Sequence, residues 1–292
     1  MKTKLFAAML IGYALTLAGC IANTVEGDDE LDAMTADPLS MPSPIIAFEQ
    51  ERGWGSHHLK WHVERRWDRL GASDRNWAKG QGYERATLQE GEKSNGLEFL
   101  AMHRAMLRAL TGEFPKQKTL FQGWATVPTD PRDKIAPLAH GDRTAFDSEM
   151  NKALDRLENH IDSFADDDDL GRYIETKMRP LAGKPNNYAN EVGAGLHNYL
   201  HNRFSDSSSS IDIGDPSVNL QNKRFWQLHG WLDARWTAFR AAKGLKDSEP
   251  GYKNALELAT AEIRMLHKDP PKGGKGANGP PQSLIDFLKS GE

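Results

Sequence analysis

The fold is decided by two stretches of sequence, GLHNYLH at residues 195–201 and FWQLHGWLD at residues 225–233. His197 and His201 are four positions apart, and on a helix this spacing places both side chains on one face. His229 follows on a second predicted helix. Three neutral imidazoles suit copper, zinc, iron or nickel. The sequence therefore predicts helices that turn histidines toward a bound metal ion.

A second group of histidines lies upstream, in the stretch HHLKWH at residues 57–62. His58 and His62 repeat the four-residue spacing, and His103 follows on another predicted helix. If the phase of this helix differs from the predicted one, His57 instead of His58 is the expected ligand. Bundles build metal sites from inward-facing side chains on neighbouring helices, so we expect the two groups to meet in the core.

Apolar residues at helical spacing predict a mainly α fold, a helical bundle with a central four-helix metal site and long irregular connections. The central helices are expected near residues 57–70, with Ser56 as N-cap, and near 97–110, 188–204 and 222–242. Further helices are expected over residues 143–164 and 252–267, and a short amphipathic tail over residues 283–289 closes the chain. Irregular structure is expected over residues 71–95 and 111–141, and an acidic loop over residues 166–169.

The downstream stretches resemble the second-copper region of tyrosinases and related type 3 copper proteins. The family pattern is His-Asn-x-x-His, then an Asp-Pro pair, then Phe-x-x-x-His with an aspartate four residues after the histidine. In this chain the pair is Asp215-Pro216 and the aspartate is Asp233. Residues 98–107 read EFLAMHRAML and resemble the family's Phe-Leu-x-x-His-Arg-x-x-Leu helix, which places His103 at the first copper ion.

The upstream half departs from the tyrosinase pattern, because Ser94 stands where the family usually has a histidine, nine positions before His103. The His58 and His62 pair is similar instead to the first-copper pattern of arthropod haemocyanins. The resemblance implies two copper ions and two sets of ligands, namely His58, His62 and His103, and His197, His201 and His229. The departure keeps a site with a single metal ion as an alternative.

The resemblance also implies roles for residues beside the ligands, and it makes Asn198 and Phe225 the catalytic candidates. Tyrosinases that hydroxylate monophenols often have an asparagine at the position of Asn198, which orients a water together with a glutamate. Glu191 is nearby, but its spacing differs from that of the family glutamate. A phenylalanine at the position of Phe225 lies over the copper pocket. Gly230 replaces a histidine that is frequent in the family, and we expect it to widen or alter the substrate entrance.

Two charged residues are expected to support the ligands. Metal-bound histidines normally donate their other ring N–H to a carboxylate or a carbonyl. Asp233 lies one turn after His229 and is expected in this role, with an ion pair to Arg203 or Arg235 as the alternative. Arg104 follows His103 and is expected to tie helices together through a carboxylate.

The N-terminus predicts export. Lys2 and Lys4 precede the apolar stretch Leu5–Leu17, which has the length of a signal-peptide core and is short for a membrane span. The residues Leu17-Ala18-Gly19-Cys20 resemble the lipobox of bacterial lipoproteins, in which the cysteine is lipidated. An ordinary secretory signal is the alternative. We therefore expect a protein held in the cell envelope by lipid on Cys20, at the outer membrane in a Gram-negative host.

These patterns divide the chain into four parts. We expect a lipoprotein signal peptide over residues 1–20 and a flexible, acidic tether over residues 21–45. The metal-binding domain is expected over residues 46–269, and a Pro/Gly-rich tail over residues 270–292.

Composition narrows the function. Cys20 is the single cysteine, which excludes thiolate zinc sites and iron–sulfur clusters. A net charge of −4 argues against nucleic acid as a partner. The resemblance implies a copper-dependent oxidoreductase that uses O2 to oxidise a phenolic or catecholic small molecule or a tyrosine-like group. The alternatives are a non-catalytic copper- or O2-binding lipoprotein and, less favoured, a hydrolase-like zinc site, since neither His-x-x-x-His contains the glutamate of a zinc protease.

Overall fold

The computed structural model of this protein describes residues 37–128, 143–176, 195–205, 208–268 and 279–290. The expected signal peptide, with Cys20, and the expected tether as far as residue 36 lie outside the described residues, as does Glu191.

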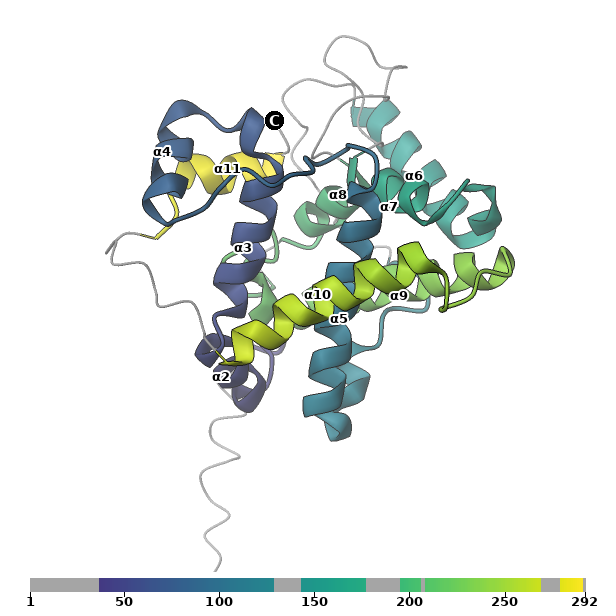
Figure 1. Ribbon diagram of the computed structural model, residues 1–292, viewed down its shortest axis with the longest axis horizontal. Helices are drawn as coiled ribbons and strands as arrows, with labels where there is room; N and C mark the ends of the chain where they lie inside the picture. Colours follow the sequence, from purple (N-terminus) through teal and green to yellow (C-terminus); the bar gives the residue numbers. More distant parts are fainter. Residues whose placement is uncertain (1–36, 129–142, 177–194, 206–207, 269–278, 291–292) are drawn as a thin grey trace, which may run out of the picture. The chain divides into compact units, whose positions relative to one another are not determined.

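The protein is mainly α-helical, as predicted (Figure 1). The described helices are α2 (Ser43–Glu51), α3 (Trp54–Arg65), α4 (Ala72–Gly80), α5 (Asn95–Glu113), α6 (Arg143–Asn159), α7 (Asp167–Thr176), α8 (Leu196–Arg203), α9 (Lys223–Ala242), α10 (Pro250–Lys268) and α11 (Gln282–Ser290). Short 3-10 turns occupy Trp67–Arg69, Pro115–Phe121, Ile161–Ser163 and Asn219–Gln221. Within the described ranges, the β structure consists of an isolated bridge between Ser40 and Asn222.

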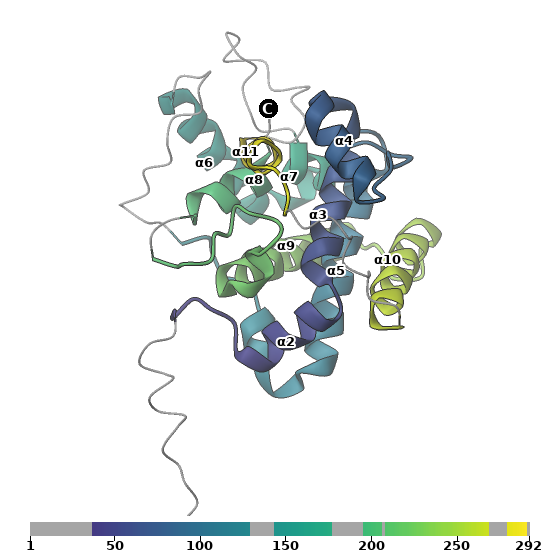
Figure 2. The ribbon, with the colours of Figure 1, turned by 90° about the vertical axis from the view of Figure 1, so that its left-hand side faces the viewer.

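Helix α5 forms the centre of the fold. It packs against α7, α9 and α10, and both Figure 1 and Figure 2 show α10 beside it. Every residue from Phe99 to Leu107 is buried, as expected for a helix that is covered on several sides. A Cβ atom at Gly96 would lie 2.3 Å from the backbone nitrogen of Arg172, so the close approach of α5 and α7 requires glycine there. Helix α5 is thus the element on which the other helices are assembled.

Helix α4 occupies a segment for which a loop was predicted, and that prediction is wrong. The segment has few apolar residues, and its buried contacts come late in the helix, where Ala78 and the neighbouring Trp77 pack on a small hydrophobic cluster. The buried carboxylate of Asp74 also accepts a hydrogen bond from Ser283 at 2.7 Å. Tertiary contacts rather than a long apolar stripe stabilise this helix.

Helix α7 begins inside the predicted acidic loop, which corrects a second prediction. Asp167, Asp168 and Asp169 form its first turn, where negative charge interacts favourably with the helix dipole. Asp168 also accepts a hydrogen bond from the backbone N–H of Gly96 at 2.9 Å, at the start of α5. The acidic run therefore begins one helix and holds the N-terminus of another.

The start of α3 differs from the prediction as well. Its N-cap is Gly53, in the left-handed region with φ 63°, whereas Ser56 lies inside the helix. Glycine adopts this conformation without the steric cost of a Cβ atom. The helix thus begins earlier than expected and brings both His58 and His62 within its regular part.

The folded domain extends beyond both predicted boundaries. Met41 and Ile45 are buried, so the chain already contributes to the core before residue 46. At the other end, Leu284 and Leu288 of α11 are buried in a cluster with Leu59 of α3. The C-terminal segment is therefore part of the domain in its last helix and not merely a tail.

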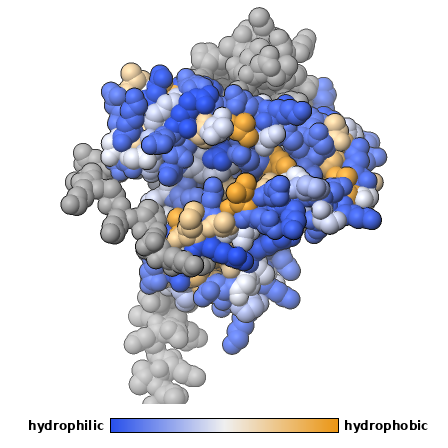
Figure 3. All heavy atoms as spheres, in the orientation of Figure 1, coloured by the Kyte–Doolittle hydropathy of each residue, from blue (hydrophilic) through white to orange (hydrophobic). Residues whose placement is uncertain are grey.

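The face seen in Figure 3 is mostly hydrophilic. Among the described residues, large apolar side chains are strongly exposed at Leu258 and Met265, both on α10. In the parts of the chain that the structure describes, no helix has the length and apolar character needed to cross a membrane.

Candidate metal centre

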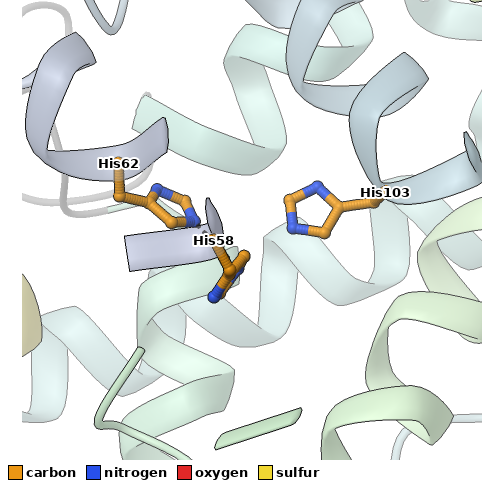
Figure 4. A group of neighbouring side chains, drawn as sticks. All are labelled: His58, His62 and His103. Atoms are coloured by element: carbon orange, nitrogen blue, oxygen red, sulfur yellow. Dashed lines mark hydrogen bonds between the residues drawn. The ribbon is translucent and has the colours of Figure 1, made fainter. Parts of the chain in front are cut away.

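Four helices bring six buried histidines together. Helix α3 supplies His58 and His62, α5 supplies His103, α8 supplies His197 and His201, and α9 supplies His229. Each of the six side chains is between 1% and 6% exposed. Figure 4 shows how the three upstream residues approach one another from α3 and α5. The predicted central four-helix site is therefore present in the fold.

The ring nitrogens of these histidines approach one another closely. The Nε2 atom of His197 lies 3.0 Å from Nε2 of His201 and 3.0 Å from Nε2 of His229. On the upstream side, Nε2 of His62 lies 3.2 Å from Nε2 of His58. Imidazole nitrogens bind metal ions at about 2.0–2.1 Å, so two of them on one ion lie about 3 Å apart. The observed separations match that requirement.

Hydrogen bonds on the far side of the rings determine which nitrogen carries the proton. The Nδ1 atoms of His201 and His229 each lie 2.7 Å from a backbone carbonyl, of Ile213 and Phe225 respectively. A carbonyl can only accept, so Nδ1 must donate and Nε2 must present its lone pair in a neutral ring. The same holds for His103, whose Nδ1 lies 2.9 Å from the carbonyl of Phe99.

This arrangement cannot be a set of ordinary hydrogen bonds between rings. If Nε2 of His197 carries a proton, that one proton faces two acceptor nitrogens at 3.0 Å, in His201 and in His229, and can make a well-aligned hydrogen bond to one of them only. A metal ion bound by both nitrogens satisfies that arrangement. The convergence of these nitrogens is therefore an arrangement that could hold a metal ion.

The surroundings of the six histidines keep their side chains neutral. Burial lowers the pKa of all six histidines, to about 3 for His103 and about 4 for His201, and neighbouring histidine rings add to the shift in all but His201. Neutral imidazole is the form that binds metals. The centre is therefore deprotonated at neutral pH without any further change.

The candidate ligands form overlapping groups. One group consists of His58, His62 and His103, and another of His103, His197 and His229, with ligand atoms within 4.8 Å of one another in each. His201 joins through its 3.0 Å approach to His197. The structure thus brings together both predicted sets and places His103 between them. These buried clusters have the composition and spacing to hold a metal ion.

Of His57 and His58, the structure places His58 in a candidate ligand group. His57 belongs to none of the candidate ligand groups found among the described residues, whereas His58 does. Nδ1 of His58 lies 3.3 Å from the carbonyl of Pro216, and its Nε2 faces the centre. His160, by contrast, has a side chain that is 65% exposed and lies 3.6 Å from Asp155.

Aromatic side chains surround the histidines. Phe225 is fully buried, and its ring lies 4.0 Å from that of His229 and 5.2 Å from that of His58, measured between centroids. It is not among the residues that line the open space beside the histidines. Phe99 contacts both His103 and His197 in the same way, at 4.6 and 4.9 Å. These rings keep the ligands in an apolar environment.

The open space beside the histidines is small. It is lined by His58, His62, Arg66, His197, Asn198, His201, Asn202, Gly214, Pro216, Asn219, Leu288 and Lys289. It offers about 20 Å³ to the centres of water molecules, which is room for one or two waters. The candidate catalytic residue Asn198 is part of this lining.

The end of α11 covers this space. The side-chain amide of Asn198 donates to the carbonyl of Leu288 at 3.2 Å, and that of Asn202 donates to the carbonyl of Lys289 at 2.6 Å. The ammonium of Lys289 also pairs with Asp212. In this arrangement Asn198 therefore holds the C-terminal helix in place.

Arg104 and Asp233 form an ion pair that links α5 to α9. The guanidinium also donates to Thr237 at 2.8 Å and to the hydroxyl of Tyr252 at 3.0 Å, which reaches α10. The prediction that Arg104 ties helices together through a carboxylate is confirmed. The expected contact between Asp233 and His229 is absent from the described hydrogen bonds, because the Nδ1 atom of His229 donates to Phe225 instead.

Gly230 has a packing role that the sequence did not indicate. A Cβ atom at this position would lie 2.4 Å from the backbone nitrogen of Gly123 and 2.6 Å from the carbonyl oxygen of Phe121. The segment that follows α5 therefore crosses α9 in direct backbone contact. Gly230 is absent from the lining of the open space, so the expectation that it widens an entrance is not supported by its position.

The sequence analysis did not identify three charged residues that lie near the centre. Arg66 and Glu90 form a buried ion pair at 2.7 Å. Glu175 is buried beside them, and a carboxylate oxygen of Glu175 lies within 4.8 Å of a ring nitrogen of His62 and of a carboxylate oxygen of Glu90. They come from three separate segments, and no local spacing connects them with the histidines. Their burial, at 1–3% exposure, is the feature that identifies them.

The chain was compared with protein-family models and with curated proteins. No protein-family model matches the chain. No curated protein matches it either.

Proposed function

We propose that this protein is a copper-dependent oxidoreductase of the tyrosinase and catechol oxidase type, which uses O2 to oxidise a phenolic or catecholic substrate. The observation that carries the proposal is the convergence of Nε2 atoms from six buried histidines on four helices. The sequence resemblance to type 3 copper proteins favours copper over the other ions that imidazole binds.

Two copper ions fit the residues present. His58, His62 and His103 would hold one ion, and His197, His201 and His229 the other. The donor set is entirely nitrogen from neutral imidazole, which suits copper in both of its common oxidation states. A bound pair supplies the binding and reduction of O2, chemistry that belongs to the cofactor.

The chain itself contributes orientation and a dry environment. Backbone carbonyls fix the tautomers of His103, His201 and His229, so that each Nε2 faces inward. Phe99 and Phe225 exclude water from the ligands. Asn198 lines the open space, and a role in orienting a hydroxyl or a water there requires its amide to release the carbonyl of Leu288.

A second candidate is a non-catalytic copper- or O2-binding protein, and the size of the open space favours it. A volume of about 20 Å³ for water centres admits O2 or a water but no phenol ring. Oxidation of a phenol therefore requires the end of α11 to move. The two candidates differ in whether that movement occurs.

The test is O2 consumption by copper-loaded residues 21–292 in the presence of a catechol or a monophenol. The oxidoreductase proposal predicts catechol-dependent uptake that is lost in His201→Gln and retained in His160→Gln, which alters an exposed residue. Reversible O2 binding without consumption would favour the second candidate. Copper binding with neither behaviour would leave copper storage as the function.

We also propose that the protein is exported and anchored by lipid on Cys20, so that the centre acts in the cell envelope. The lipobox-like Leu17-Ala18-Gly19-Cys20 carries this proposal. Cys20→Ser is expected to release the protein from membranes and to block processing at this site. Unchanged processing and membrane association in that variant would contradict the lipid anchor.

A further inference from the structure

Glu175 is a buried carboxyl group that the centre described so far does not use. It lies near the end of α7, is 1% exposed, and neither of its carboxylate oxygens has a hydrogen-bond partner. Burial, together with the charge of Glu90, raises its pKa well above the usual value. An unsatisfied buried polar group costs free energy, and such groups in native proteins call for a functional explanation.

Glu175 lies beside one of the candidate ligands. Ligand-type atoms of His62, Glu90 and Glu175 are within 4.8 Å of one another, and all three residues are buried. The Nε2 atom of His62 faces His58 at 3.2 Å, so Nδ1 is the nitrogen left for the carboxyl groups. In Figure 4 the two ring nitrogens of His62 lie on different sides, one toward His58 and one away from it.

The partners of Glu90 argue against a third metal site here. Arg66 donates two hydrogen bonds to Glu90, at 2.7 Å to one carboxylate oxygen and 2.9 Å to the other. Arg69 adds a longer contact at 3.8 Å. These contacts occupy both oxygens and neutralise the carboxylate. Of Glu90 and Glu175, it is therefore Glu175 whose carboxyl oxygens remain able to accept a hydrogen bond.

Among the described hydrogen bonds, His62 and His197 differ from the other four histidines in the support of the second ring nitrogen. His58, His103, His201 and His229 each place Nδ1 within 3.3 Å of a backbone carbonyl. Among the described hydrogen bonds, no carbonyl takes this place for His62. A metal-bound His62 thus has an N–H to donate, and the unsatisfied carboxyl group within 4.8 Å of it is that of Glu175.

We propose that Glu175 is a positioning residue of the metal centre, whose carboxyl group accepts the Nδ1–H of His62, directly or through one water, when Nε2 binds metal. A single water can join polar atoms at the separation observed here. Because a carboxylate partner makes imidazole a stronger donor, the ion held by His58, His62 and His103 binds more tightly. The same effect favours the more oxidised state of copper at that position and lowers its reduction potential.

The test is Glu175→Gln, which keeps the shape of the side chain and removes its ability to form a carboxylate. Glu49→Gln is the matched control, because Glu49 is also buried with both oxygens unpartnered but belongs to no candidate ligand group among the described residues. Copper affinity is measured by competition with a chelator, and the reduction potential by titration. We expect Glu175→Gln to bind one copper about 10- to 100-fold more weakly and to show a raised potential. Glu49→Gln should change neither, and Glu175→Asp should recover part of the loss.

The proposal rests on the function proposed above, and the outcomes separate the two. If the wild-type protein binds two coppers and Glu175→Gln leaves affinity and potential unchanged, the role of Glu175 is wrong and the copper centre stands. If the wild-type protein binds three ions and the variant two, Glu175 is a ligand and the positioning role is wrong. If the wild-type protein binds none, both proposals fail. The metal-free variant should melt no lower than the wild type, since glutamine removes a buried acid, and this excludes unfolding as the cause.

Discussion

The imidazole rings of His103 and His229 are stacked, with 4.3 Å between their centroids and 17° between their planes. His103 comes from α5 and His229 from α9, so this contact joins the upstream and downstream groups of histidines. His103 is also the residue that both candidate ligand groups share. The centre is therefore one connected structure rather than two separate sites.

The shared position of His103 makes it the most sensitive ligand. His103→Gln is expected to remove one bound copper and to weaken the other at least tenfold, whereas His62→Gln should affect one copper alone. Metal content per chain and chelator competition measure both effects. His160→Gln, at an exposed position, is the control. Full copper content in His103→Gln would show that this residue is not a ligand.

The metal-free protein should lose stability in mild acid. Burial lowers the pKa of His103 to about 3 and that of His201 to about 4. It also lowers the pKa values of the other four histidines of the centre. Because the unfolded chain has ordinary histidines with a pKa of about 6.5, it takes up protons first as the pH falls. The stability is complete above about pH 6.5 and decreases below it, by up to about 1.4 kcal/mol per histidine per pH unit.

Urea unfolding of the metal-free chain at pH 7, 6 and 5 tests this dependence. Glu49 has the opposite effect on the free energy of unfolding, because burial raises its pKa to about 9. Its contribution to that free energy decreases as the pH rises above about 4.5. Glu175, with its raised pKa, has the same sign. The histidines outnumber these carboxyl groups, so the midpoint should fall clearly from pH 7 to pH 5. Equal midpoints at the two pH values would contradict neutral, buried histidines.

The backbone contact at Gly230 predicts a large effect from a small substitution. Gly230→Ala places a methyl group 2.4 Å from the backbone nitrogen of Gly123, so the two segments must separate, at a cost of about 1–3 kcal/mol in unfolding free energy. Gly112→Ala is the control, since no atom lies within 4 Å of the added group and alanine favours the helix by about 0.5–1 kcal/mol. Denaturant unfolding measures both, and equal stabilities of the two variants would refute the close contact.

Because the end of α11 covers the open space beside the histidines, a substitution that loosens this helix should let substrates enter more easily. Lys289→Glu replaces the ion pair with Asp212 by repulsion and loosens the end of the helix that covers the open space. We expect kcat/KM for a catechol to rise about two- to fivefold, in line with the free energy of a partly exposed pair. Lys253→Glu on α10, which removes an exposed pair with Glu257, should leave it unchanged. An unaltered kcat/KM in Lys289→Glu would mean that substrates do not enter past α11.

The clustering of the histidines was predictable because their spacing follows local rules. A spacing of four residues on a helix puts two side chains on one face, whatever the rest of the chain does. The structure accordingly brings His58, His62, His197 and His201 to one place, with His103 and His229 from the adjoining helices. The mainly α class was predictable for the same reason.

Other features depend on contacts between distant segments and were not predictable. The run of aspartates at residues 166–169 reads as a solvated loop, yet Asp168 caps α5 from the start of α7. Asn198 contacts a carbonyl of α11, ninety residues further along the chain. Glu175 has no neighbour in sequence that connects it with His62. Such roles follow from packing, and a single sequence contains no periodic signal for them.

The central claim is tested most directly by the number and position of copper ions in the loaded protein. Metal analysis of residues 21–292, combined with anomalous diffraction from a crystal, measures both quantities. The account predicts two coppers per chain, one beside His58, His62 and His103 and the other beside His197, His201 and His229. A single copper, or copper bound elsewhere with these histidines left unliganded, would contradict it.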